Sequence, residues 1–264
     1  MKAMILNIGA EVLSGKVVNT NAAFIGSELR KIGIETERIA VVGDNPDMIK
    51  NELVAFQNSS SKILITTGGL GPTHDDLTKE VICNFLGLKT EKREDPLKRL
   101  EEYFGGSFPE VNKKQAEFPK EALLLDNKIG TAPGAIIPYQ DKIYILLVGP
   151  YTEMKLMFAD SVLPYLQEIS GKNINASEFT VMGKSESAFE ENLSNLYRSY
   201  PDVNIASYPE EGKIRFVLQS TNFETYQEAL GEFKKLMKDY IVSESGESIE
   251  EVVVGLLKNK GYKI

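Results

Sequence analysis

The sequence predicts an α/β fold in which a mostly parallel sheet lies between two layers of helices, followed by a small α+β domain. Within residues 1–90, a short apolar run and an amphipathic helical stretch alternate three times. Such β-loop-α repeats imply right-handed crossovers, a parallel sheet and helices on both faces, which is a three-layer α/β/α arrangement. Beyond residue 170 the order changes to β-α-β-β-α, which is typical of a ferredoxin-like sandwich.

The first domain is predicted to span residues 1–170. Short apolar runs predict its strands at residues 4–8, 39–42, 62–65, 123–125, 135–138 and 143–148. Apolar stripes predict its helices, one between the capping residues 19–21 and Gly33, and others at 47–56, 77–86 and 152–169. Residues 91–120 are charged and helical in part.

The second domain is predicted to span residues 171–245, after a turn at residues 170–173. Apolar runs predict strands at 179–182, 203–207 and 213–219, and helical spacing predicts helices at 187–197 and 225–240. A last segment, 246–264, carries an amphipathic helix at 248–260.

Composition limits the class of partner. The net charge is −8, so neither nucleic acid nor an anionic membrane surface would be attracted. The single cysteine, Cys83, allows no internal disulfide, and its apolar helical surroundings predict a buried core residue. The sequence has no signal-like segment and no stretch of 18 apolar residues, from which we expect a cytoplasmic protein.

The loop TTGGLGPTHDD at residues 66–76 is the strongest candidate for a site. Gly68, Gly69 and Gly71 let the backbone approach a ligand closely, and their amides suit phosphate oxygens at the start of the next helix. Asp75 and Asp76 lie at that same end and would repel phosphates unless a divalent metal lies between them. The alternative is that Thr73 or Asp75 only caps the helix.

Carboxylates also follow the first two strands. Glu11 and Asp44 lie after them as Asp76 lies after the third, so three strand ends each carry an acid. Ligands of parallel sheets bind at this edge, so these carboxylates predict a hard-cation site. His74 could contact phosphate or metal, but a lone histidine and a lone cysteine exclude a structural zinc site.

Three further residues are candidates for substrate contact, each with a purely structural alternative. Asn19 and Asn21 could contact a ligand, although capping the following helix would account for them. Gly134 ends the run GTAPG at 130–134, where a tight turn would also explain the glycine.

Several motifs resemble those of one family. They are 9–15 with 18–21, 41–45, TTGGLGPTHDDLT at 66–78, 112–116, 130–134 and 147–154. Together they resemble the CinA family, formerly called competence/damage-inducible proteins, over essentially the whole chain. The first domain resembles the molybdopterin-binding domain of the MoaB/Mog type. Ala10 stands where the family has threonine, so that hydroxyl is missing as a ligand contact, and Val148 and Tyr151 stand where it has prolines, so the last loop lacks the rigidity that prolines give.

The resemblance implies a metal-dependent ADP-ribose pyrophosphatase that gives AMP and ribose 5-phosphate. It implies a divalent cation (Mg²⁺, Mn²⁺ or Co²⁺), with a monovalent cation such as K⁺ as an optional addition, and a homodimer. Many members carry a further domain that deamidates nicotinamide mononucleotide; its catalytic stretch would lie beyond Ile264, so we expect no deamidase activity from this chain.

These expectations assign roles to the candidate residues. Asp76, Asp44 and Asp75 would be catalytic residues; Asp76 and Asp44 would be metal ligands or the base that orients water, and Glu11 would be a secondary metal ligand. The glycine amides, Thr73, His74, Asn19, Asn21 and Gly134 would contact the substrate. Two alternatives stay open, namely a molybdopterin- or nucleotide-binding protein without hydrolysis, and nucleotidyl transfer in molybdenum cofactor synthesis.

Overall fold

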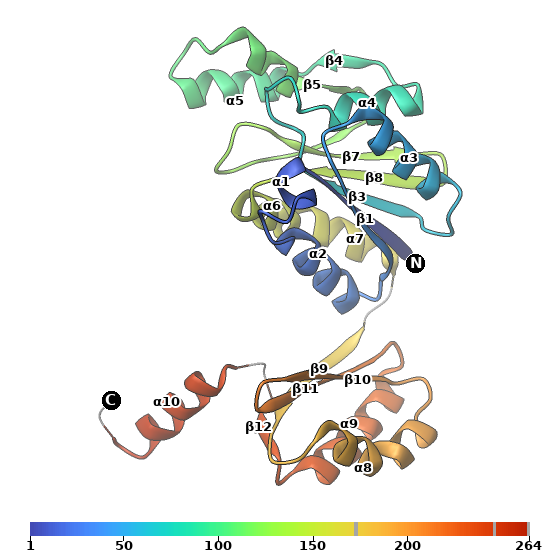
Figure 1. Ribbon diagram of the computed structural model, residues 1–264, viewed down its shortest axis with the longest axis vertical. Coiled ribbons are helices and arrows are strands. Elements are labelled where there is room, and N and C mark those ends of the chain that lie inside the picture. The colour runs from blue at the N-terminus through green and yellow to red at the C-terminus, as the bar shows by residue number, and fades with distance from the viewer. Residues whose placement is uncertain (172–173, 245–246, 263–264) are drawn as a thin grey trace. The chain divides into compact units, whose positions relative to one another are not determined.

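The chain divides into two compact units, residues 1–171 and 172–264, each with its own hydrophobic core (Figure 1). The computed structural model describes residues 1–171, 174–244 and 247–262. The second boundary expected from the sequence, at 245–246, lies outside the described residues, as do residues 172–173 of the first expected boundary region.

A six-stranded mixed sheet forms the middle layer of the first unit, in the order β2-β1-β3-β8-β7-β6. Its strands are β1 (Lys2–Ile8), β2 (Glu35–Val42), β3 (Ile63–Thr67), β6 (Leu123–Leu125), β7 (Gly134–Tyr139) and β8 (Lys142–Leu147). The pairs β2–β1, β1–β3 and β3–β8 are parallel, whereas β7 runs antiparallel to both β8 and β6. The predicted mostly parallel sheet is therefore confirmed.

Helices cover both faces of this sheet, as the three-layer prediction requires (Figure 1). One face carries α2 (Thr20–Lys31) and a long helix made of α6 (Tyr151–Met157), the π-helical segment η2 (Phe158–Val162) and α7 (Leu163–Ser170), and the other carries α3 (Pro46–Gln57) and α4 (Thr78–Leu86). Each helix buries the apolar stripe seen in the sequence; in α3 the stripe is Ile49, Leu53 and Phe56. Burial of such a stripe, rather than helix propensity, stabilises helices of this length.

An excursion between α4 and β6 was predicted only as partly helical. It contains β4 (Thr90–Lys92), α5 (Glu94–Phe104), the 3₁₀ helix η1 (Glu110–Ala116) and β5 (Glu117–Pro119). The two short strands pair antiparallel and were missed, because three exposed residues such as those of β4 carry no alternation that a sequence pattern could detect.

The strand directions bring five connections to one edge of the sheet. β1, β2, β3 and β8 run parallel, so their carboxyl ends share that edge, and β7 starts there because it runs the opposite way. The connections are 9–19, 43–45, 68–77, 126–133 and 148–150. The short helix α1 (Ala10–Leu13) lies within the first of them.

The second unit is an antiparallel α+β sandwich. Its described elements are β9 (Asn175–Val181), α8 (Glu186–Ser199), β10 (Asn204–Glu210), β11 (Lys213–Ser220), α9 (Phe223–Met237), β12 (Ile241–Ser243) and α10 (Ile249–Asn259). The sheet order is β10-β11-β9-β12, which agrees with the ferredoxin-like character predicted from the β-α-β-β-α sequence; β12, which was not predicted, completes the β-α-β-β-α-β unit. Phe179, Phe189, Phe216 and Phe233 fill its core.

Cys83 is a core residue, as predicted. Its side chain is buried in α4, and burial raises the pKa of the thiol to about 11. Of the helices in the described parts of the chain, none combines the length and the apolar character needed to cross a membrane.

Gly68 and Gly87 both have positive φ, so alanine variants of the two allow a matched test of how closely the glycine loop packs against β1. Gly68 has φ of 98°, and a Cβ there would lie 2.1 Å from the Ile8 carbonyl oxygen. Gly87 ends α4 with φ of 68° and has no neighbouring atom within 4 Å of such a Cβ. We expect Gly87→Ala to cost about 1 kcal/mol through backbone strain alone, and Gly68→Ala to cost about 2 kcal/mol more because backbone must move.

The measurement is the midpoint of thermal unfolding of the first unit for both variants and the wild-type chain. Equal shifts for Gly68→Ala and Gly87→Ala would show that the close approach of β1 to the glycine loop is absent in solution.

Candidate functional site

A cavity of about 440 Å³ opens at the shared edge of the first unit's sheet. Its polar lining includes Glu11, Asp44, Asp75, Asp76, Thr73, Gln115, Thr131 and Glu153, together with the glycines 68, 69 and 71. The structure thus brings the three predicted metal-ligating carboxylates to one place, although they come from three different connections.

The glycine loop does not act as a simple helix cap. The N-cap position of α4 is Leu77, and no side chain accepts a hydrogen bond from the first turn of that helix. Asp76 instead turns back toward the loop, where its Oδ2 accepts a hydrogen bond of 2.9 Å from the Thr73 backbone N–H. The alternative that Thr73 or Asp75 only caps the helix is therefore not the arrangement found.

The glycine amides differ in their availability to a ligand. The Gly68 N–H donates to the Leu147 carbonyl at 3.0 Å, so the expectation that it would hold a phosphate is wrong. For the N–H groups of Gly69 and Gly71, the described residues provide no acceptor. These two amides can therefore donate to a ligand in the cavity.

Thr73 holds two carboxylates close together. Its Oγ1 lies 2.5 Å from Asp75 Oδ1 and 2.5 Å from Asp76 Oδ2, and a hydroxyl can donate to only one of them at a time. The hydrogen bond from the Thr73 hydroxyl, and then that from the Asp75 backbone, lower the pKa of Asp75. Asp75 is therefore ionised at neutral pH, and two like charges lie side by side at the mouth of the cavity.

Lys114 fixes this loop from the side of the excursion. Its Nζ donates to the carbonyl oxygens of Thr73 at 2.6 Å and Asp76 at 2.8 Å. The Lys79 ammonium, in turn, donates to the Lys114 carbonyl and lies 4.5 Å from the centre of the Phe118 ring. Lys79 is only 4% exposed, and burial lowers its pKa. Through these contacts, Lys79 and Lys114 connect α4, η1 and the glycine loop.

Asp44 and Glu11 complete the carboxylate side of the cavity. Asp44 Oδ2 accepts a hydrogen bond of 2.9 Å from the Ala10 backbone N–H, which leaves its other oxygen for a ligand. The Glu11 carboxylate folds over Gly9, where a Cβ would lie 2.6 Å from Glu11 Oε1. Ala10 thus contributes its backbone, so the missing threonine hydroxyl leaves the Asp44 contact intact.

Asn19 and Asn21 act mainly as structural residues. Asn19 Oδ1 accepts from the Ala22 N–H and caps α2, while Asn19 Nδ2 donates to the buried Asn7 at 3.0 Å. Asn21 Nδ2 donates to the Gly149 carbonyl at 2.8 Å, which holds the last connection against the start of α2. Both asparagines line a neighbouring cavity of about 360 Å³ that shares Glu11 with the first.

Two predicted substrate contacts lie away from the main cavity. The His74 side chain is 98% exposed and is absent from the cavity lining. Gly134 is buried at the start of β7, where a Cβ would lie 2.6 Å from the Leu146 carbonyl oxygen and 2.4 Å from Met157 Sδ. That glycine is needed for packing and does not reach the cavity.

The sequence analysis missed four polar side chains of the cavity lining. Tyr103 is on α5, Gln115 on η1, Thr131 in the β6–β7 connection and Glu153 on α6. Three of them belong to motifs at 112–116, 130–134 and 147–154, whose polar residues were given no role. The polar residues of those motifs were the available signal.

The charge of the cavity restricts what it can bind. Five carboxylates line it, those of Glu11, Asp44, Asp75, Asp76 and Glu153, and neither lysine nor arginine is among its described lining residues. An anionic ligand would therefore be repelled unless a cation accompanied it. In the described residues, no group of three or more His, Cys, Asp or Glu side chains is close enough to form a metal site by itself.

Comparisons with known proteins agree with the fold of the first unit. Residues 4–168 match the family described as probable molybdopterin binding domain. Relatives along the full chain include a putative competence-damage inducible protein of Caldicellulosiruptor saccharolyticus (39% identity) and a CinA-like protein of Dictyoglomus turgidum (40%); the chain covers 66% of the length of each. The crystal structure of the protein CinA from Thermoplasma acidophilum is 32% identical, with a TM-score of 0.58, over 64% of this chain and 97% of that one.

Lys113 and Lys114 are neighbours in η1 and provide a matched test of how Lys114 holds the glycine loop. We expect Lys114→Met to destabilise the first unit by about 1–3 kcal/mol, because two carbonyls of the glycine loop lose a charged donor. Among the residues that the structure describes, Lys113 pairs with the exposed Glu110 alone, so Lys113→Met should cost less than about 1 kcal/mol. Thermal unfolding and hydrogen exchange of residues 68–78 measure the effect, and similar protection of that segment in both variants would contradict it.

Proposed function

This chain belongs to the probable molybdopterin binding domain family and to its CinA-like members, and we propose that its first unit hydrolyses a nucleotide diphosphate linkage with the help of a divalent cation. ADP-ribose is the proposed substrate, and AMP and ribose 5-phosphate are the proposed products. The observation that carries the proposal is the set of carboxylates from three connections around one cavity, beside the available amides of Gly69 and Gly71.

The donor set suits a hard divalent cation. Carboxylate oxygens are the preferred protein ligands of Mg²⁺, which keeps several waters and takes only one or two carboxylates directly. That coordination preference agrees with the arrangement found, in which Asp76, Asp44 and Glu11 line one cavity but do not form a complete set of metal ligands. These three side chains would hold the ion, directly or through its waters. Bound there, the cation would neutralise the diphosphate and lower the pKa of a bound water.

The residues of the chain would then bind the phosphates, orient the attacking water and accept its proton. The amides of Gly69 and Gly71 donate to phosphate oxygens, and the start of α4 adds favourable dipole potential. Asp44 orients a water whose oxygen forms a bond to one phosphorus while the bridging P–O bond breaks. The bridging oxygen leaves with the other phosphate, and the water's proton passes to Asp44 and then to solvent. Because its pKa is lowered, Asp75 stays anionic and attracts the cation rather than acting as an acid.

The chain spans about two thirds of the length of these relatives. The proposal therefore concerns the first unit alone, and the homodimer stays a prediction. Binding of a nucleotide or pterin without hydrolysis is the main competing function, because the family description itself names only binding.

Substitution of Asp76 tests the proposed hydrolysis. We expect Asp76→Asn to lower ADP-ribose turnover by ~10²–10³, because a group that stabilises charge in the transition state is lost. The Asn side-chain oxygen can still accept from the Thr73 N–H, so the loop should stay folded. Product analysis with Mg²⁺, Mn²⁺ or Co²⁺ measures turnover.

The matched control is Asp47→Asn, an exposed acid of α3 outside the cavity, which should leave turnover unchanged. Normal hydrolysis by Asp76→Asn would reject the assignment. Thermal stabilisation of the wild-type chain by ADP-ribose and metal, without AMP formation, would favour binding without hydrolysis.

A further inference from the structure

One wall of the cavity is a tightly fixed loop, residues 126–132, between β6 and β7. Asn127 is 2% exposed and is the centre of this wall. Its Nδ2 donates to Glu153 Oε2 at 2.7 Å and to the Ala132 carbonyl at 2.9 Å, and its Oδ1 accepts from the Gly130 N–H at 2.9 Å. The Asn127 side chain therefore sets the shape of the loop and the position of the Glu153 carboxylate.

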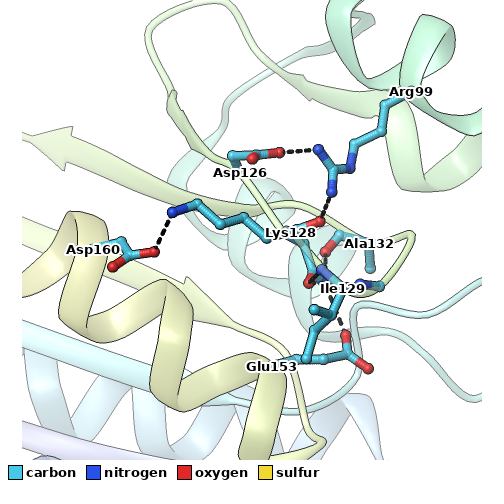
Figure 2. Close-up of polar contacts among 9 residues, drawn as sticks. Arg99, Asp126, Lys128, Ile129, Ala132, Glu153 and Asp160 are labelled. Atoms are coloured by element: carbon cyan, nitrogen blue, oxygen red, sulfur yellow. Dashed lines mark hydrogen bonds and ion pairs between the residues drawn. The ribbon is translucent and has the colours of Figure 1, made fainter.

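Two further elements brace the same loop from outside the cavity. Arg99 of α5 donates to the Asn127 carbonyl and pairs with Asp126 at 2.5 Å, and Lys128 pairs with Asp160 of η2 at 2.7 Å (Figure 2). The loop is thus held between the excursion on one side and the α6–η2 helix on the other. Such support gives the cavity wall a fixed geometry before any ligand binds.

Glu153 keeps one acceptor for a ligand. A Cβ on Gly130 would lie 2.1 Å from Glu153 Oε2, so the glycine is what allows the carboxylate to pack against the loop. Oε2 is used by Asn127, whereas no hydrogen bond to Oε1 occurs within the described residues. Nor does any lysine or arginine of the described chain form an ion pair with Glu153. An anionic acceptor without a counter-charge therefore borders the cavity.

Thr131 lies on the same wall as a second hydrogen-bonding group. Its Oγ1 accepts from Gln115 Nε2 at 3.2 Å, and Gln115 Oε1 accepts from Asn112 at 3.0 Å. The threonine hydroxyl hydrogen is therefore left to donate to a ligand. An acceptor and a donor that lie on one wall, without a cation, suit neutral hydroxyl groups and not a phosphate.

An aromatic ring lies beside this wall. Tyr103 follows Arg99 by four residues on α5, so both side chains are on the same face of that helix. Arg99 contacts the loop, and Tyr103 lines the cavity with its side chain 60% exposed. Such a ring offers a face on which a base can stack.

We propose that Glu153 accepts a hydrogen bond from a ribose hydroxyl of the nucleoside half of the substrate. Thr131 provides the neighbouring hydroxyl contact, and Tyr103 provides the stacking face for the base. Carboxylates accept hydrogen bonds from ribose hydroxyls in other nucleotide sites, which supports this chemistry. The inference rests on the proposed function, because it assigns to the same cavity the part of the substrate that is not the diphosphate.

The test compares two mononucleotides by calorimetry at saturating Mg²⁺, namely AMP and 2′,3′-dideoxy-AMP. No hydrolysis is involved, so the result does not depend on turnover. We expect the wild-type chain to bind AMP about 10-fold or more tightly than the dideoxy analogue, because a hydrogen bond to a charged acceptor is lost. In Glu153→Gln the amide oxygen stays with Asn127 and the charged acceptor is lost, so the preference for AMP should fall several-fold, to the smaller part that Thr131 and a neutral amide can supply.

Asp160→Asn is the matched control. Asp160 braces the same loop through Lys128 but is not part of the cavity lining, so the discrimination should persist in this variant. Equal binding of the two ligands by the wild-type chain, discrimination undiminished in Glu153→Gln, or no AMP binding at all would each overturn the inference. Discrimination by the wild-type chain that falls several-fold in Glu153→Gln would support it even if ADP-ribose is not hydrolysed, and that combination would reject only the proposed hydrolysis.

Discussion

The gathering of carboxylates around one cavity, at one edge of a parallel sheet, is the constraint on which the site depends. Thr73 holds Asp75 and Asp76 around one hydroxyl, and Asp44 and Glu11 line the same cavity. Lys79 and Lys114 donate to backbone carbonyls, and neither of them lines the cavity, although the charge of Lys114 contributes to the lowered pKa of Asp75. Such a cluster costs free energy in the absence of a counter-charge. A cavity built in this way is suited to a ligand that includes a cation, which connects the fold to the chemistry of diphosphates.

Glycines at this site make room for carboxylates more than for phosphates. A Cβ would lie 2.6 Å from Glu11 Oε1 at Gly9, 2.5 Å from Asp76 Oδ2 at Gly71 and 2.1 Å from Glu153 Oε2 at Gly130. Each glycine therefore lets an acid fold back against the backbone. The sequence analysis interpreted the loop glycines only as phosphate contacts, because a pattern of glycines shows that something approaches closely but does not show what.

The sequence predicted most of the sheet and half of the site, for separable physical reasons. Residues 4–8 and 63–65 are mainly apolar and buried on both faces of the sheet, so their composition reveals the strands. The start of β2 at Glu35 was missed because that edge strand is polar and partly exposed there. Glu11, Asp44 and Asp76 were found because they follow predicted strands. Glu153 and Lys114 were missed because their roles arise from contacts with residues distant in the sequence, Asn127 and Thr73.

The long excursion between α4 and β6 is best understood as the support of the cavity. It supplies Lys114, which holds the glycine loop through two carbonyls, and Arg99, which holds the opposite wall through Asn127. The same segment also contributes Gln115 and Tyr103 to the lining. The strand ends alone would give a shallow edge with acids on it, because the parallel sheet ends there. The excursion converts that edge into a cavity with two walls, one carrying the strand-end carboxylates and the glycine loop and the other carrying Glu153 and Thr131, and two walls of different composition can orient a ligand whose two halves differ in chemistry.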